Sequence, residues 1–161
     1  MRWLVAFLVG LPLPALALSC LPYGVTDAYL EADASGEAFV PVLGTMQYDA
    51  GAVPQVDWDK QGDVPSLTRI PAVFSGHALT QRGIDLALTT DVILEVKCSG
   101  PWCPSPKPGP VLAFLRKKGE TSYAVSTNAC GGFLFGAPTP EQISAVKDCL
   151  AGRGCRPSAD H

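Results

Sequence analysis

The chain has 161 residues, of which 47% are apolar and only 17% are charged, with a formal net charge of −3. This length fits one domain rather than two. Twelve Lys and Arg residues against fifteen Asp and Glu leave no basic excess to neutralise phosphates, which argues against a nucleic-acid-binding protein. The two histidines, His77 and His161, leave little material for histidine-based metal or acid–base chemistry. We therefore expect no metal site and no cofactor.

The first residues have the order of an export signal. Met1 and Arg2 are followed by an apolar run over 3–16, and Ala15 and Ala17 place small residues where a signal peptidase cuts. The sequence therefore predicts a signal peptide over 1–17, with cleavage possible as late as residue 19. The run is shorter than the ~20 residues that a transmembrane helix needs, so we expect no membrane span after cleavage. The predicted location is periplasmic or secreted.

The six cysteines indicate a disulfide framework, because their number is even and export leads to an oxidising compartment. Two pairs flank short reversing segments, which can bring their Cα atoms within bridging range. The two remaining cysteines, Cys20 and Cys130, would tether the mature N-terminus to the core. The spacing of Cys98, Cys103 and Cys130 does not fit a zinc ribbon, which disfavours a metal site. The predicted pairs are Cys98–Cys103, Cys149–Cys155 and Cys20–Cys130.

Alternation of apolar and polar residues is strongest over 84–96, which predicts a long antiparallel strand with one buried and one wet face. Proline and glycine interrupt two of the other predicted strands, which is typical of edges, bulges or barrel corners. The predicted strands over 111–116 and 121–127 are expected to form a hairpin around a turn at 117–120. The other four predicted strands cover residues 38–48, 70–80, 111–116 and 121–127.

A helix is predicted from Pro140, with Thr139 as N-cap and Gln142 completing a capping box. Glycines at 152 and 154 end it, and a shorter helix is expected over 26–32. Two long loops, 50–66 and 99–110, separate the strands. The predicted organisation is a single domain over 18–155 and a disordered tail over 156–161.

Five short strands, a late helix and a tethered N-terminus suggest a small closed or partly closed barrel. The order of segments resembles the netrin-like OB-fold domain, as in tissue inhibitors of metalloproteinases and related bacterial exported proteins. The resemblance implies a mainly β fold: a small five-stranded OB-like barrel with a C-terminal α-helix, stapled by disulfides. It rests on Cys20 and on the segments 38–44, 92–97, 109–114 and 126–130.

Hydrolase, zinc-protease and phosphate-loop motifs and a Cys-x-x-Cys pair are absent from the sequence, so we expect a protein that is not an enzyme. Trp58, between Asp57 and Asp59, and Trp102, between two cysteines, are the candidates for an exposed contact surface. The favoured function is an exported binding module whose partner is a protein or a cell-envelope component.

Two alternatives stay open at this point. One is a metalloprotease inhibitor acting through Cys20, because inhibitors of the resembling family bind the protease zinc with the amine and carbonyl of an N-terminal cysteine. The other is a thiol–disulfide redox protein.

Overall fold

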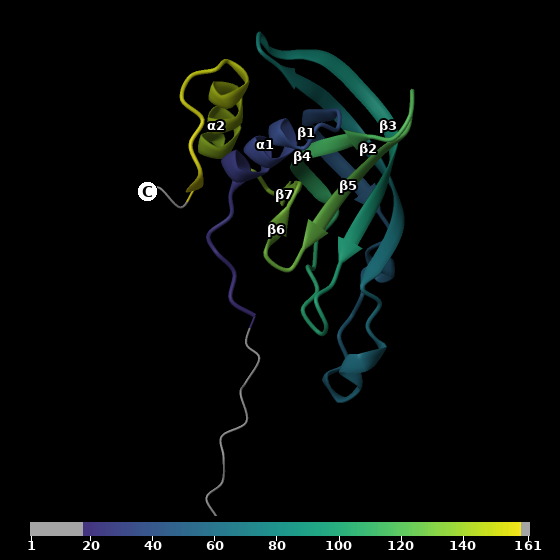
Figure 1. Ribbon diagram of the computed structural model, residues 1–161. Coiled ribbons are helices and arrows are strands. Elements are labelled where there is room, and N and C mark those ends of the chain that lie inside the picture. The colour runs from purple at the N-terminus through teal and green to yellow at the C-terminus, as the bar shows by residue number, and fades with distance from the viewer. Residues whose placement is uncertain (1–17, 159–161) are drawn as a thin grey trace, which may run out of the picture.

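The structure, a computed structural model, describes residues 18–158 (Figure 1). The predicted signal peptide over 1–17 therefore lies outside the described residues. This part of the chain is mainly β, with two α-helices and two short 3-10 helices, η1 and η2. In chain order the elements are α1 (Val25–Ala34), β1 (Phe39–Tyr48), η1 (Ala50–Ala52), η2 (Trp58–Asp63), β2 (Leu67–Thr80), β3 (Gly83–Lys97), β4 (Gly109–Lys117), β5 (Tyr123–Asn128), β6 (Gly131–Gly132), β7 (Leu134–Gly136) and α2 (Pro140–Leu150).

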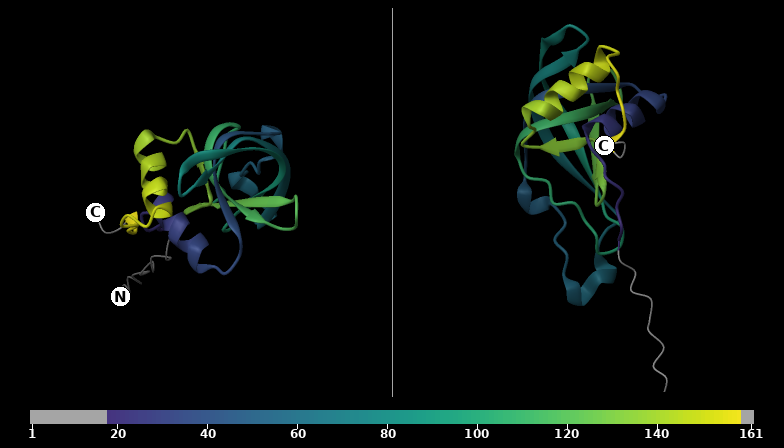
Figure 2. Two further views of the ribbon diagram at one scale, coloured as in Figure 1. Left: turned by 90° about the horizontal axis from the view of Figure 1, so that it is seen from above. Right: turned by 90° about the vertical axis from the view of Figure 1, so that its left-hand side faces the viewer.

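The strands pair in a closed circuit, which is seen end-on in Figure 2. Antiparallel pairing joins β1 to β2, β2 to β3 and β1 to β4. β5 closes the circuit, because it pairs in parallel with β3 and antiparallel with β4. The five strands thus follow one another around a ring in the order β1, β2, β3, β5, β4.

The predicted hairpin of β4 and β5 is present only as a short contact of two residue pairs, Arg116 with Ala124 and Lys117 with Tyr123. The main partner of β5 is β3, from Val92 opposite Tyr123 to Lys97 opposite Asn128. This parallel pairing is possible because the whole of β4 and its flanking loops form the crossover that parallel strands require.

The interior of the ring is the larger of two hydrophobic cores. Alternation along β3 places Val92, Leu94 and Val96 in it, as the sequence pattern predicts. On the opposite face of β3, from Ala87 to Lys97, the residues are exposed except Glu95, which is only 7% exposed. It is the exception on a face predicted to be mostly wet, because two guanidinium groups cover the carboxylate, Arg116 at 3.1 Å and Arg69 at 3.6 Å.

The second core lies outside the ring, on the side where the two helices lie (Figure 2). Leu112 and Phe114 of β4 are fully buried there, against Ala28 of α1 and Val146 of α2. The helix predicted from Pro140 is confirmed with its capping box: Thr139 Oγ1 accepts from the N–H of Gln142, and the Gln142 side chain accepts from the N–H of Thr139. These contacts satisfy two backbone donors that a helix start would otherwise leave unpaired.

The three predicted disulfides are confirmed, with Cα–Cα distances of 5.3 Å for Cys20–Cys130, 4.3 Å for Cys98–Cys103 and 4.6 Å for Cys149–Cys155. The first ties the N-terminal segment to the turn between β5 and β6.

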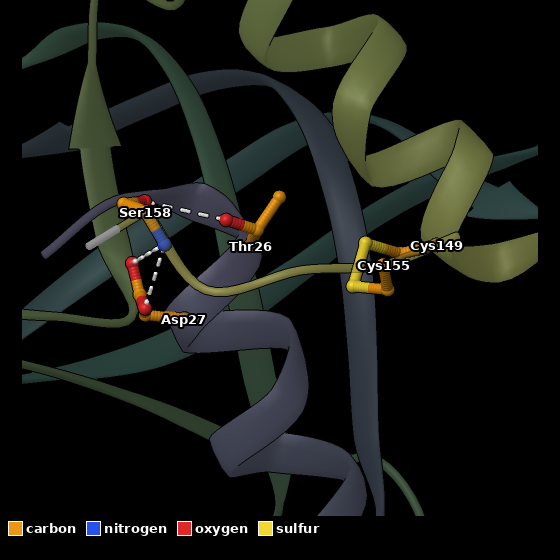
Figure 3. The surroundings of a disulfide bond; sticks show 5 residues. All are labelled: Thr26, Asp27, Cys149, Cys155 and Ser158. Atoms are coloured by element: carbon orange, nitrogen blue, oxygen red, sulfur yellow. Dashed lines mark hydrogen bonds between the residues drawn. A yellow bond between two sulfur atoms is a disulfide. The ribbon is translucent and has the colours of Figure 1, made fainter. Parts of the chain in front are cut away.

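The bond between Cys149 and Cys155 turns the chain back after α2 toward the start of α1 (Figure 3). There the N–H of Ser158 donates to Asp27 Oδ1 over 3.1 Å, and the hydroxyls of Ser158 and Thr26 lie 3.3 Å apart. Ser158 belongs to the segment 156–161 that was expected to be a disordered tail. It is held on α1, and residues 159–161 lie outside the described part of the chain.

Candidate functional site

The two long loops lie at the same end of the ring (Figure 1). This follows from the strand directions: β1 and β3 are both antiparallel to β2, so they point the same way and the loops that follow them leave from one end. The loop 50–66 follows β1 and carries Trp58. The loop 99–110 follows β3 and carries Trp102. Strand order alone therefore brings the two candidate tryptophans to one surface.

Trp58 and Trp102 are in contact with each other. Their ring centroids are 5.7 Å apart and their planes are inclined by 73°, an edge-to-face arrangement. Trp58 is nevertheless 58% exposed and Trp102 is 38% exposed. Each ring thus packs against the other with one part and presents the rest to solvent. We refer to Trp58, Trp102 and the flanking Asp57 and Asp59 as the tryptophan surface.

The Trp102 side of this surface is fixed by short-range bonds. The Cys98–Cys103 disulfide closes a small loop, in which the N–H of Ser99 donates to the carbonyl of Trp102 over 2.9 Å and the reverse bond measures 3.2 Å. Gly100 allows the reversal, with a φ of +59°. Because a covalent bond and two hydrogen bonds already order this loop, little conformational entropy is left to lose when a partner binds.

The Trp58 side is ordered by Asp57, which is the N-cap of η2. Asp57 Oδ1 accepts from the N–H of Asp59 over 3.0 Å, and the Asp57 carbonyl accepts from the N–H of Lys60 over 3.0 Å. The Lys60 ammonium lies 4.0 Å from Asp57 Oδ2, an exposed ion pair of small energetic weight. Asp57 therefore has a structural task as the cap of η2, whereas Asp59 is exposed beside Trp58.

A hollow of about 490 Å³ adjoins the tryptophan surface. Buried Val53 lies in its wall, and Asp57, Lys60 and Asp63 supply charged groups. Over residues 49–65 the sequence has four aspartates and one lysine, so this part of the surface is acidic. The site has exposed aromatic area, a concave wall and negative charge, and each of these can contact a binding partner.

Groups that could perform chemistry are not gathered there. Within residues 18–158, no three His, Cys, Asp or Glu side chains lie close enough together to hold a metal ion. His77 is exposed on β2, in the strand rather than in either loop. No helix in the described part of the chain is long and apolar enough to cross a membrane.

Two features of the structure had no signal in the sequence. One is the ion cluster of Glu95 with Arg69 and Arg116, in which the three residues come from three different strands. The other is a cleft beside the end of α1, whose walls come from α1, β1, β4 and α2.

Comparisons of the chain with protein-family models, with curated proteins and with solved structures found no match in any of the three.

Proposed function

We propose that the protein is an exported binding module without enzymatic activity, which binds a protein or a cell-envelope component through the tryptophan surface. The observation that carries the proposal is the contact of Trp58 with Trp102, because it joins two separate loops into one exposed aromatic patch. Tryptophan is the side chain that contributes most often to binding hot spots. A patch supported by a disulfide needs little reordering to bind.

We also infer that the ring is an OB-like barrel of the netrin-like kind. The pairing order β1, β2, β3, β5, β4, with β3 and β5 parallel, supports this inference, as does the disulfide from Cys20 to Cys130. Export to the periplasm or the medium is part of the same proposal. It is supported by the leader sequence and by three disulfides, which persist in oxidising compartments.

Site-specific photo-cross-linking tests the proposed surface. A benzophenone amino acid is placed at position 58, at position 102, or at Leu86, an exposed apolar residue on β3 outside both loops. Each protein is irradiated with the cell-envelope fraction of the source cells. We expect a discrete adduct of one mass from positions 58 and 102 and none from position 86. The same adduct from all three positions, or none from any, would refute the proposed surface.

Competition gives a second readout on the same adduct. An excess of unlabelled wild-type protein should suppress the adduct formed from position 102. The Trp58→Ala variant should suppress it much less, because half of the aromatic patch is missing. Equal suppression by both proteins would show that the adduct does not depend on the tryptophan surface.

Inhibition of a metalloprotease through Cys20 is the second candidate. One observation favours it: Cys20 is exposed, and its bond to Cys130 fixes its backbone on the surface. Only a chain that begins at Cys20 has a free amine at that residue. We therefore expect a form starting at Cys20, and not one starting at Leu18, to inhibit a zinc protease such as thermolysin. Absence of inhibition by both forms would remove this candidate.

A thiol–disulfide redox protein is the third candidate and the least supported. Cys98, in the disulfide with the smallest sequence separation, is buried, and burial limits the access of an attacking thiolate to its sulfur.

A further inference from the structure

A second concave site lies away from the tryptophan surface, on the side of the ring where the two helices pack. It is a cleft of about 320 Å³, which is at the lower end of the range for small-molecule sites. Its walls come from the last turns of α1, the start of β1, the middle of β4 and the end of α2. Its lining includes Tyr29, Asp33, Glu37, Phe39, Phe114 and Leu150.

The base of the cleft is aromatic and rigid. Phe114 is fully buried, and Tyr29 packs against it edge to face with ring centroids 6.5 Å apart. Phe39 is fixed in turn by Phe133, at a centroid distance of 4.8 Å. Leu150 closes the apolar wall from α2. A ligand with a ring or a short alkyl body would therefore exchange water for a preformed apolar surface.

The rim of the cleft is negative. Asp33 lies in the last turn of α1, where the helix dipole is also negative and where no basic residue compensates it. Glu37 lines the rim too, but its charge is shared with Arg116, whose guanidinium is 3.1 Å away. Asp33 has no ion pair with any side chain that the structure describes. The cleft thus has one carboxylate that is not neutralised.

The neighbouring tyrosine responds to this charge. The pKa of Tyr29 is raised, first by burial and then by the nearby carboxylate of Asp33. The contribution of Asp33 to this raised pKa means that a second negative charge is disfavoured beside it. The same electrostatic potential favours a bound cation. The aromatic faces of Tyr29 and Phe39 add to that preference, because ring quadrupoles attract positive charge.

We propose that this cleft binds a small organic cation, with its ammonium group at Asp33 and its apolar body over Phe39 and Leu150. A neutral molecule of the same shape would gain the apolar contacts and lose the charge-assisted hydrogen bond. A carboxylate of the same shape would be repelled by Asp33. The site is independent of the tryptophan surface and of the function proposed for it.

Titration followed by backbone amide NMR tests the proposal with a defined probe. Phenethylammonium carries a ring and a cation, and 2-phenylethanol is its neutral counterpart of nearly equal size. We expect saturable shifts for phenethylammonium at amides of residues 29–39 and near Leu150. The neutral probe should bind at least about tenfold more weakly, which corresponds to about 1.4 kcal/mol.

Two variants give the matched controls. Asp33→Asn removes the charge at an exposed position and should weaken phenethylammonium binding by about tenfold or more. Asp59→Asn removes an equal charge at the tryptophan surface and should leave the binding unchanged. The proposal is overturned by equal affinity for the two probes, by unchanged affinity in Asp33→Asn, by shifts confined to residues 50–66 and 99–110, or by the absence of saturable binding.

Discussion

Gly44 of β1 lies directly opposite Gly76 of β2, and the ring of Phe74 lies against both glycines. A Cβ atom added at Gly44 would lie 2.6 Å from the Cα of Gly76 and 2.8 Å from the Cζ of Phe74. Phe74 is fully buried inside the ring. The two glycines therefore leave the room that this large core side chain requires.

This relationship gives a stability prediction. Gly44→Ala forces the backbone of β1 away from β2 or Phe74 away from its position, so it should lower the free energy of unfolding by about 2 kcal/mol or more. Gly136→Ala is the matched control, because a Cβ there would meet nothing within 4 Å. Urea unfolding of the two variants measures the difference. Equal stabilities would contradict the packing described here.

The contact of the two tryptophans should be measurable as a coupling energy. Because Trp58 is mostly exposed, we expect Trp58→Ala to change the melting temperature little. Combined with Trp102→Ala in a double-mutant cycle, the two changes should deviate from additivity by about 0.5–1.5 kcal/mol, the usual range for an aromatic pair. Unfolding of Trp58→Ala at room temperature would mean that Trp58 is a core residue and would remove it from the proposed surface.

The carboxylate of Asp27 should make stability depend on acidic pH. Burial alone would raise its pKa, but hydrogen bonds from Ser158 and from the N–H of Gly24 outweigh burial and lower it. A lowered pKa in the folded state means stability that is present at neutral pH and is lost as pH falls below about 4. Asp27→Asn should therefore be less stable than wild type at pH 7, and the difference should shrink in acid. A difference that stays constant from pH 7 to pH 3 would contradict this account.

The hydroxyl of Tyr48 is buried without a hydrogen-bond partner among the described residues. Removing an unsatisfied buried group is favourable, so Tyr48→Phe should raise the free energy of unfolding by about 1 kcal/mol. Burial also raises the pKa of Tyr48 to about 12. Tyr48 should therefore contribute a loss of stability as pH rises from about 10 toward 12, and Tyr48→Phe should lose less stability than wild type over this range.

Tyr23→Phe is the control for this change, because the same atom is removed where it donates to Glu31 over 2.7 Å. It should destabilise the protein at pH 7. Chemical denaturation of both variants at pH 7 gives the sign, and a stabilised Tyr23→Phe or a destabilised Tyr48→Phe would refute the assignment.

The disulfides should differ in how much they contribute to the free energy of unfolding. Cys20–Cys130 spans 110 residues and Cys98–Cys103 spans five. From chain entropy, replacing the first pair by serines should cost about 4–5 kcal/mol and replacing the second about 2 kcal/mol. Unfolding of the two double variants under non-reducing conditions gives the order. A larger loss from the short loop would show that chain entropy is not the dominant effect.

Much of the fold could be predicted from local patterns. Alternation predicted the buried face in the second half of β3, although Leu86 earlier on the same strand is exposed. The capping residues predicted the start of α2, because capping depends on neighbours within a few positions. Glu95 was assigned to the wet face because alternation cannot show that Arg116 of β4 will cover it. The β4–β5 hairpin was overestimated for a related reason, since adjacency in sequence does not reveal that β3 is the better partner for β5.

The candidate site was predicted residue by residue but not as a unit. The loop positions of Trp58 and Trp102 indicate exposure, whereas their contact depends on β1 and β3 pointing in one direction. The cleft proposed to bind an organic cation could not be predicted from the sequence. Its walls at Asp33 and Leu150 are more than one hundred residues apart, and nothing local marks either of them.

The parallel pairing of β3 with β5 also bears on how the molecule is assembled. The order of strands around the ring differs from their order in the chain, because β5 lies between β3 and β4. Cys130 lies two residues after the end of β5, and its bond to Cys20 therefore holds the N-terminal segment against the strand that completes the ring.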